Sequence, residues 1–294
     1  MVYSNAAIEI SGKSQIVGVM GWPVEHSLSP QMHNAAFTEM NLPFVYVPFA
    51  VRPANLETAI SGLTALGMRG VNLTIPHKEA ALSLVHELDE SAARAGAVNT
   101  IVQKDGKLKG YNTDGIGFLK PLSNDGFKFE GGRAVILGAG GAARSAAFAL
   151  VAQGMHVTLV NRTLERARAL AEAVNEWSSN SSVDYVVLNS DESLRQIVGK
   201  SELLVNTTRV GMHPNETEPP PVSEEILHSG LFVYDLVYNP QETRLLQMAR
   251  ELGCRTLNGV RMLVEQGAAA FELWTGLKPD SSVMESAVLK GLQR

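Results

Sequence analysis

The sequence has only one cysteine, Cys254, among its 294 residues. A single thiol can form neither an internal disulfide nor a cysteine-rich zinc site, which favours a reducing compartment. We therefore interpret Cys254 as a buried apolar side chain, and we predict no metal site.

The sequence also lacks an excess of positive charge, because its 25 Lys and Arg residues are outnumbered by 30 Asp and Glu residues. A formal net charge of −5 argues against the basic surface that neutralises nucleic acid or an anionic membrane. No apolar run reaches the length of a membrane span, and the first residues resemble neither a signal peptide nor a transit peptide. We predict a cytoplasmic protein that binds no nucleic acid and no membrane.

Hydrophobic residues are present in ordinary amount, 45% of the chain, which is enough for two domains. Strand-like and helix-like segments alternate with short connections, which is typical of α/β proteins with parallel sheets. In the first part, we predict strands at 15–21, 44–51 and 70–76, helices at 31–41, 55–67 and 78–89, and a hairpin over 97–112 around Asp105-Gly106.

A second series of elements begins near Gly131. It is predicted to contain an apolar strand, a glycine turn and a small-residue helix within 133–154, a helix at 165–177, and strands at 156–163, 185–189, 202–208 and 231–240. The chain ends in two helices, 258–276 and 282–293, which have no following strand. We expect these helices to pack on elements formed earlier in the chain.

The glycine turn, "GAGGAAR" at 138–144, follows a strand and opens a helix, which is the context that makes a Gly-x-Gly-x-x-Ala pattern meaningful. Gly138 permits the tight turn, Gly140 lets the backbone approach a pyrophosphate, and Ala143 keeps helix and strand close. The free N–H groups of the helix start would face the anion. The alternative is a glycine turn that binds nothing.

The end of the next strand favours NADP over NAD. An NAD-specific fold would place Asp or Glu there to hold the ribose 2′-hydroxyl, but this sequence has Asn161 and Arg162, with Arg166 one turn further on. A guanidinium suits a 2′-phosphate. The alternative, a solvated helix start, is less favourable because cations at a helix N-terminus need an anion to meet them.

The stretch "GVNLTIPHK" at 70–78 places polar groups at the end of an apolar strand. Strand alternation predicts that Asn72 and Thr74 share one face, and Pro76 ends the strand and leaves Lys78 at the edge of the sheet. The alternative is that the two polar side chains satisfy neighbouring backbone groups and that Lys78 is a solvated lysine.

Other polar groups favour a substrate site at this edge. Asn99 lies in "AVNT", Asn112 and Asp114 lie in "YNTDGIG", and Ser27 and Ser29 flank a turn in "GWPVEHSLSP". Ser29 could also act as a helix N-cap.

Eight motifs along the chain resemble those of the shikimate dehydrogenase family. In order they are "GWPVEHSLSP", "NLTIPHK", "AVNT", "YNTDGIG", "GAGGAAR", "NRT", "YNPQET" and "EQGAAAFELWTG". The resemblance covers essentially the whole chain. It implies reduction of 3-dehydroshikimate to shikimate with NADPH, on the route to aromatic amino acids, by a protein that is a monomer or a homodimer.

The resemblance also implies an α/β fold of two domains. Residues 1–114 with 261–294 would form a mixed α/β substrate domain to which the C-terminal helices return, and residues 115–260 would form a Rossmann-like NADP-binding domain.

By the same resemblance, Lys78 and Asp114 match the catalytic pair of the family. The residues expected to bind substrate are Ser27, Ser29, Asn72, Thr74, Asn99, Tyr238 and Gln266. The residues expected to bind NADP are Gly138, Ala139, Gly140, Gly141, Ala142, Asn161, Arg162, Thr163, Arg166, Thr207, Gly259 and Met262. We assign no role to His77.

Reduction of a ketone leaves an alkoxide that must be protonated, and Lys78 is the candidate donor, oriented by Asp114. Because the reverse oxidation requires a neutral lysine, activity in that direction should rise with pH. Two alternatives stay open: a quinate/shikimate dehydrogenase that uses NAD or both cofactors, and a non-catalytic NADP-binding regulator.

Overall fold

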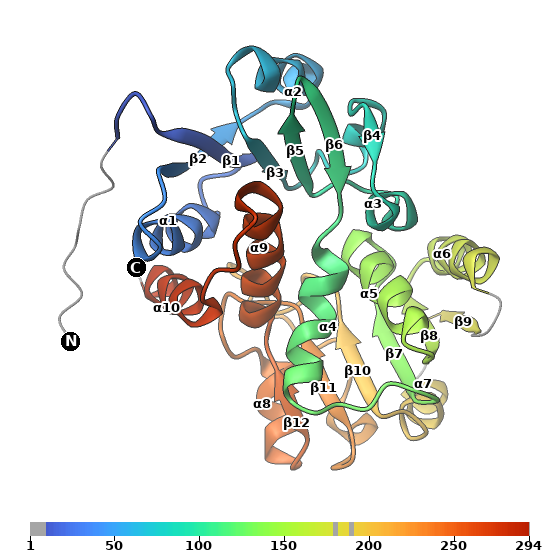
Figure 1. Cartoon of the computed structure of the whole chain (residues 1–294). Helices are drawn as coiled ribbons and strands as arrows, with labels where there is room; N and C mark the ends of the chain where they lie inside the picture. Colours follow the sequence, from blue (N-terminus) through green and yellow to red (C-terminus); the bar gives the residue numbers. More distant parts are fainter. Residues whose placement is uncertain (1–9, 179–181, 188–190, 294) are drawn as a thin grey trace. The chain divides into compact units, whose positions relative to one another are not determined.

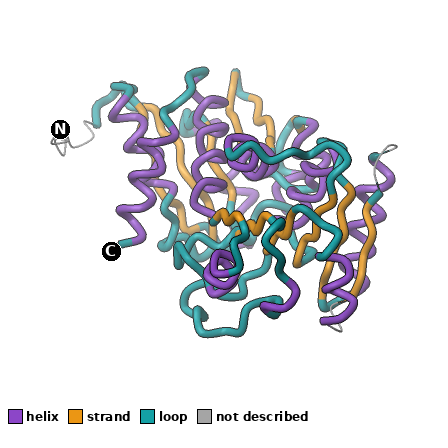
Figure 2. The backbone as a smooth tube through the Cα atoms, turned by 90° about the horizontal axis from the view of Figure 1, so that it is seen from below, coloured by secondary structure: helices purple, strands orange, loops and turns teal. Residues whose placement is uncertain are grey.

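The computed structural model describes residues 10–178, 182–187 and 191–293 (Figure 1). The chain divides into two compact units. The first unit contains Met1–Thr113 and Val264–Arg294, and the second contains Asp114–Leu263. Figure 2 distinguishes the helices from the strands that alternate with them along the backbone.

The first unit is built on a mixed six-stranded sheet in the order β2-β1-β3-β5-β6-β4. Its strands are β1 (Gln15–Gly21), β2 (Phe44–Ala50), β3 (Gly70–Leu73), β4 (Glu87–Leu88), β5 (Thr100–Lys104) and β6 (Lys107–Tyr111). Strands β2, β1 and β3 are parallel, whereas β5 is antiparallel to both of its neighbours. The predicted hairpin is confirmed: Asp105 and Gly106 connect β5 to β6 with φ values of 51° and 79°, as a tight hairpin turn requires.

The helices of the first unit cover both faces of this sheet. They are α1 (Ser29–Glu39), α2 (Leu56–Ala65), α3 (Glu90–Ala95), the part of α9 (Gly259–Thr275) from Val264 onward, α10 (Ser281–Leu292), and the short 3₁₀ segments η1 (Pro53–Asn55) and η2 (Ala80–Ser83). Leu63 of α2 belongs to one buried cluster with Leu73 and Ile101 of the sheet. On the opposite face, Phe37 of α1 stacks on Phe271 of α9 at 4.7 Å between ring centroids. The two C-terminal helices were expected to pack on earlier elements, and α10 does pack against α1.

The helix predicted over 78–89 is wrong. The segment forms η2 and then the edge strand β4, in which Glu87 and Leu88 pair with Lys109 and Gly110 of β6. The ring of His86 also accepts a hydrogen bond from the Leu108 N–H at 3.0 Å. Backbone pairing with a strand that lies later in the chain therefore overrides the local helix pattern.

The second unit is a parallel six-stranded sheet in the order β12-β11-β10-β7-β8-β9. Its strands are β7 (Arg133–Leu137), β8 (His156–Asn161), β9 (Val183–Val187), β10 (Leu203–Asn206), β11 (Phe232–Asp235) and β12 (Arg255–Leu257). Its helices are α4 (Asp114–Asn124), α5 (Gly141–Ala152), α6 (Leu164–Trp177), α7 (Asp191–Val198), α8 (Arg244–Glu251) and the 3₁₀ segment η3 (Glu224–Ile226), with the start of α9. The strand order reverses at the first strand, which is the arrangement of a Rossmann fold, as predicted.

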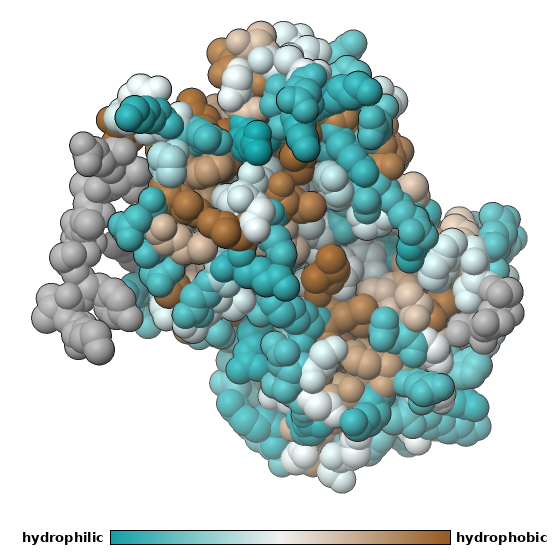
Figure 3. Space-filling model, in the orientation of Figure 1, coloured by the Kyte–Doolittle hydropathy of each residue, from teal (hydrophilic) through white to brown (hydrophobic). Residues whose placement is uncertain are grey.

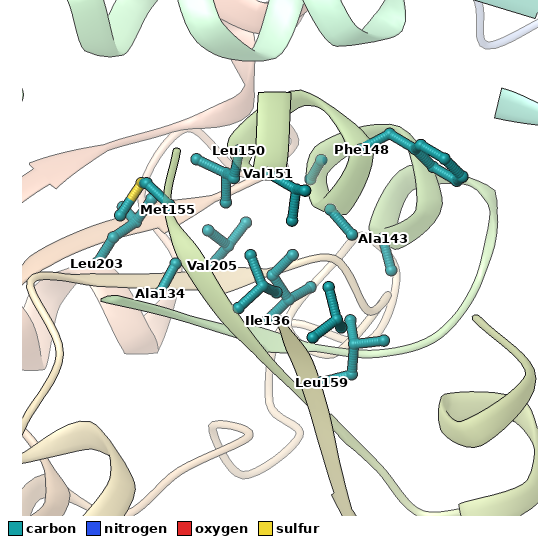
Figure 4. Packing of buried hydrophobic residues seen from close by; sticks show 14 of the residues in the cluster. Ala134, Ile136, Ala143, Phe148, Leu150, Val151, Met155, Leu159, Leu203 and Val205 are labelled. Atoms are coloured by element: carbon teal, nitrogen blue, oxygen red, sulfur yellow. The ribbon is translucent and has the colours of Figure 1, made fainter. Parts of the chain in front are cut away.

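Close packing of small and branched side chains holds α5 against this sheet (Figure 4). Ile136 and Val205 of the strands face Ala143, Leu150 and Val151 of the helix, and all five are buried. Because Ala143 has no bulk beyond Cβ, the start of the helix can lie close to the strand that precedes it.

Three helices and one short strand of the second unit were not predicted: α4, α7, α8 and β12; α3 in the first unit was missed as well. Helix α4 contains Gly115, Gly117 and Pro121. Because glycine and proline normally mark turns, the helical periodicity of this segment was not recognised in the sequence. The strand predicted over 185–189 is found as β9, while its last residues, 188 and 189, lie outside the described residues.

The surface hydropathy, the burial of the single cysteine and the lengths of the helices can be compared with what the composition predicted. On the face seen in Figure 3, hydrophobic residues form small patches among hydrophilic ones. Cys254 is buried, as predicted, and its thiol lies 3.2 Å from the His228 carbonyl oxygen. None of the described helices combines the length and the apolar character needed to cross a bilayer.

Candidate active site

The glycine turn after β7 depends on Gly138. Its φ of 112° is unfavourable for residues with a side chain, and a Cβ at this position would lie 2.5 Å from Oγ1 of Thr207. The Thr207 hydroxyl donates to the Leu137 carbonyl at 2.7 Å and so ties the end of β10 to the end of β7. Gly138 is therefore required by the folded chain itself.

Gly140 and Gly141 are not required in this way. Gly140 is the N-cap of α5 with φ −95° and ψ −170°, which any residue can adopt, and a Cβ on either glycine would meet nothing within 4 Å. No side chain caps the helix, and its first turn contains no acidic residue. The start of α5 thus has open space and N–H groups suited to an anion, and protein packing does not explain its glycines.

The contrast between these glycines gives a test. Gly140→Ala should leave the free energy of unfolding within about 1 kcal/mol of the wild type, because the new methyl group touches no protein atom, yet it should raise the KM for NADP. Gly138→Ala should lower the melting temperature, because alanine is strained at this φ and its Cβ would clash with the Thr207 hydroxyl. Thermal melts and cofactor titrations of the two variants check this, and an unchanged KM for NADP in Gly140→Ala would contradict a ligand at this helix start.

Two exposed arginines follow the end of β8. Arg162 and Arg166 are exposed, and neither forms an ion pair with any described residue, whereas Arg168 on the same helix lies 3.9 Å from Glu172. The Asn161 side chain donates to the Thr163 carbonyl at 2.9 Å, which shapes the bend that carries Arg162. Thr163 is the N-cap of α6, but its hydroxyl makes no capping bond. Two unpaired guanidinium groups at a helix start are favourable only if an anion meets them.

A buried carboxyl group that the sequence analysis missed organises the ends of β10 and β11. Asp235 accepts hydrogen bonds from Asn206 (2.9 Å), the Val237 N–H (3.1 Å) and the Thr243 hydroxyl (2.7 Å). Burial raises the pKa of Asp235 to about 6, and these hydrogen bonds act in the opposite direction. Asn206 in turn accepts from the N–H and the hydroxyl of Thr208.

Further predicted site residues lie in the loop after β11 and at the start of α9. Tyr238 is partly buried, and burial raises the pKa of its phenol. At Gly259 a Cβ would lie 2.1 Å from the Leu236 carbonyl oxygen, so backbone packing by itself requires glycine there. Met262 is partly buried against the core of the second unit.

In the first unit, backbone bonds fix the turn that carries Lys78. Strand β3 ends at Leu73, three residues earlier than predicted, and the Thr74 N–H donates to Met20 in the neighbouring strand at 3.0 Å. The Lys78 carbonyl accepts from the Val98 N–H at 2.8 Å, and the lysine is half-buried. His77 is buried, with its Nε2 2.8 Å from the Val51 carbonyl oxygen, so it anchors this turn to the segment after β2.

The two predicted serines lie at the start of α1. Leu28 is the N-cap, and Ser29 is the first helical residue, so Ser29 as the N-cap is wrong. The Ser29 N–H donates to the Ser27 hydroxyl at 3.4 Å. The Ser29 hydroxyl is therefore not used as a helix cap.

Asn72 and Asn99 are buried and bonded to protein groups. Asn72 accepts from the Tyr46 phenol at 2.8 Å and donates to the Thr100 hydroxyl at 3.0 Å and the Asn99 carbonyl at 3.1 Å. The Asn99 amide donates to the Thr113 hydroxyl at 3.0 Å.

The structure distributes the predicted residues over both units. The first unit contains Ser27, Ser29, Asn72, Thr74, Lys78, Asn99 and Gln266. The second contains Asp114, which is the buried first residue of α4, together with Tyr238 and all residues predicted to bind the cofactor. The described residues contain no group of three or more His, Cys, Asp or Glu side chains placed to hold a metal ion.

A doubly wound parallel sheet, with an open helix start after its first strand and unpaired arginines after its second, defines a dinucleotide-binding protein of the Rossmann class. Three segments match known domains: 19–101 the "Shikimate dehydrogenase substrate binding domain", 122–209 "Shikimate / quinate 5-dehydrogenase", and 259–289 the "Shikimate 5'-dehydrogenase C-terminal domain". The chain is 47% identical over 291 residues to the shikimate dehydrogenase (NADP(+)) of Methanopyrus kandleri, covering 98% of this chain and 100% of that protein. The chain belongs to the shikimate dehydrogenase family.

Two solved structures are similar to nearly the whole chain. A shikimate dehydrogenase in complex with NADP+ has a TM-score of 0.93 and 42% identity, covering 98% of this chain and 99% of that one. A quinate dehydrogenase from Corynebacterium glutamicum in complex with NAD has a TM-score of 0.86 and 33% identity, covering 94% and 99%. The fold is therefore common to relatives with different substrates and cofactors.

Proposed function

We propose that this protein is an NADP-dependent shikimate dehydrogenase, which reduces 3-dehydroshikimate to shikimate and catalyses the reverse oxidation. The observation that carries the proposal is the 47% identity to a shikimate dehydrogenase (NADP(+)) over nearly the full length of both chains. Such an enzyme would act in the cytoplasm as a monomer or a homodimer.

The two compact units would then have different binding roles. The first unit, which contains the serines at the start of α1 and the turn of Lys78, would bind the substrate. The second, with the Rossmann sheet, would bind the cofactor. The proposed domain boundaries, 1–114 with 261–294 and 115–260, lie within a few residues of the two crossings between units.

NADPH, when bound, supplies the hydride. The start of α5 at Gly140 and Gly141 has the space and the N–H groups for its pyrophosphate, and Arg162 and Arg166 have the unpaired charge for its 2′-phosphate. Both features fit the group: no side chain caps α5, and neither arginine forms an ion pair with a described residue.

Lys78 would protonate the oxygen of the reduced substrate. An ammonium group within hydrogen-bond reach stabilises the negative charge that develops on this oxygen and then delivers the proton. Asp114 would orient the lysine and contact the same hydroxyl. Ser27 and Ser29 would hold the substrate carboxylate, and Thr74, Asn99 and Gln266 would hold ring hydroxyls.

Recognition by hydroxyl and amide groups suits a small polyhydroxy acid. Each ring hydroxyl would pair with a specific donor or acceptor, so an analogue that lacks one hydroxyl leaves a polar group of the protein unpaired and is rejected. Discrimination between shikimate and quinate would arise in the same way.

Steady-state absorbance in the NADPH band tests the function directly. Shikimate and quinate are each assayed with NADP and with NAD, and we expect the highest kcat/KM for shikimate with NADP. A preference for quinate with NAD would instead support the second candidate, a quinate/shikimate dehydrogenase. The similarity to the quinate dehydrogenase of Corynebacterium glutamicum is the observation that favours this candidate. NADP binding without turnover of either acid would support a non-catalytic regulator.

A further inference from the structure

A continuous chain of buried hydrogen-bonded side chains crosses the sheet of the first unit. The Tyr46 phenol on β2 donates to Asn72 on β3, and the Asn72 amide donates to Thr100 on β5. The Thr100 hydroxyl then donates to Oδ1 of Asn99 at 3.0 Å. Tyr46, Asn72, Thr100 and Asn99 are all 6% exposed or less, so water does not compete for these bonds.

The strand register explains why these side chains meet. Tyr46 pairs with Val17 on β1, Val19 on the same strand pairs with Asn72, and Asn72 pairs with Thr100. Paired residues in a sheet share a face, and so do residues two apart on one strand. The phenol therefore extends across β1 on the face covered by α1.

Aromatic packing holds the phenol ring in place. The His33 ring stacks on Tyr46 at 4.3 Å with an interplanar angle of 3°, and the Asn34 side chain both donates to and accepts from the Tyr46 backbone at 2.8 Å. Burial lowers the pKa of His33 to about 3, so this ring is neutral at ordinary pH. Tyr46 has little freedom to change its rotamer.

The two ends of the chain lie at residues proposed to bind substrate. At one end, Tyr46 supports the helix that carries Ser29, because the ring stacked on the phenol belongs to His33, one turn after Ser29 on α1. At the other end, Oδ1 of Asn99 accepts from the Thr113 N–H at 2.8 Å, directly before Asp114. Because both amide hydrogens of Asn72 are donated to protein groups, Asn72 would influence the substrate through its neighbours.

We propose that Tyr46, Asn72 and Thr100 are positioning residues that fix the spacing between Ser29 and Asn99, the groups that recognise the carboxylate and a ring hydroxyl of the substrate. This inference rests on the proposed function. Removal of one bond would let the two recognition groups shift, and displacements well below 1 Å weaken recognition by neutral hydrogen bonds.

The test uses Tyr46→Phe in the full chain, which removes only the phenol oxygen. We expect the KM for shikimate to rise about tenfold, with kcat changed less than about twofold and the KM for NADP unchanged. Ile60→Val is the matched control, because it lowers stability slightly from the buried cluster on the opposite face of the same sheet. The proposal is overturned if Tyr46→Phe and Ile60→Val change the KM for shikimate equally.

A double-mutant cycle separates positioning from a general loss of stability. If Tyr46 acts through Ser29, then Tyr46→Phe should add less than about a twofold change in a Ser29→Ala background. Additive effects would overturn the proposal. A second double-mutant cycle combines Thr100→Val with Asn99→Ala and tests the Asn99 end of the hydrogen-bonded chain. This cycle replaces the first one if Tyr46→Phe does not fold. A wild-type protein inactive with shikimate would refute the proposed function itself, whereas an active wild type with a control-like Tyr46→Phe would refute only the positioning role.

Discussion

Replacement of Lys78 by alanine is expected to lower kcat by about a hundred- to ten-thousand-fold, which is the usual contribution of a general acid–base group. Substrate binding should be retained to a larger degree, because the proposed recognition groups are hydroxyls and amides elsewhere in the first unit. The variant should fold, since the turn is held through the Lys78 carbonyl and the His77 ring, which the substitution leaves in place.

The measurement is steady-state kinetics in both directions, with Lys104→Ala as the control because Lys104 is an exposed lysine of the same unit. A Lys78→Ala enzyme with near-normal kcat would remove Lys78 from the mechanism. In the wild type, oxidation of shikimate should be favoured as the pH rises, because that direction releases a proton.

Reversal of charge at Arg162 is expected to reduce kcat/KM for NADP by about a hundredfold while that for NAD changes little. A charge-assisted hydrogen bond contributes roughly 1.5–3 kcal/mol, and the aspartate adds repulsion toward the 2′-phosphate. NAD has a hydroxyl at this position and cannot lose an ion pair that it never forms.

Arg168→Asp is the matched control for this prediction. Arg168 is an exposed arginine on α6, the helix that follows Arg162, but it lies 3.9 Å from Glu172. Equal losses with both cofactors in Arg162→Asp, or equal effects of the two substitutions, would argue against a phosphate site at this helix start. The ratio of kcat/KM for NADP to that for NAD is the decisive quantity, because it cancels any change in the amount of folded protein.

The sequence was most informative where local chemistry decides the conformation. Asp105-Gly106 predicted a hairpin because few residue pairs adopt two successive positive φ values, and the glycine turn after β7 predicted the Rossmann unit because its function requires a strand before it and a helix after it. These signals need no knowledge of distant residues.

Failures of prediction occurred where distant contacts decide. The segment 78–89 has a helical pattern but pairs with β6. Helix α4 forms despite its glycines and proline because Phe118 and Leu122 are buried in the core of its own unit. Likewise, Asp235 gave no signal in the sequence, since its importance comes from Asn206 and Thr243, which reach it only when the strand ends meet.

The sequence by itself determined the α/β class, the glycine turn between a strand and a helix, and the family, because each depends on residue types at short or fixed spacing. Only the tertiary structure decided which of the polar side chains form hydrogen bonds to other groups of the protein. Asn72 and Thr74 look equivalent in the sequence, yet the amide of Asn72 is engaged by side chains from β2 and β5. The physical reason is that a hydrogen bond forms between groups that are close in space, and the sheet brings together residues that are far apart in the chain.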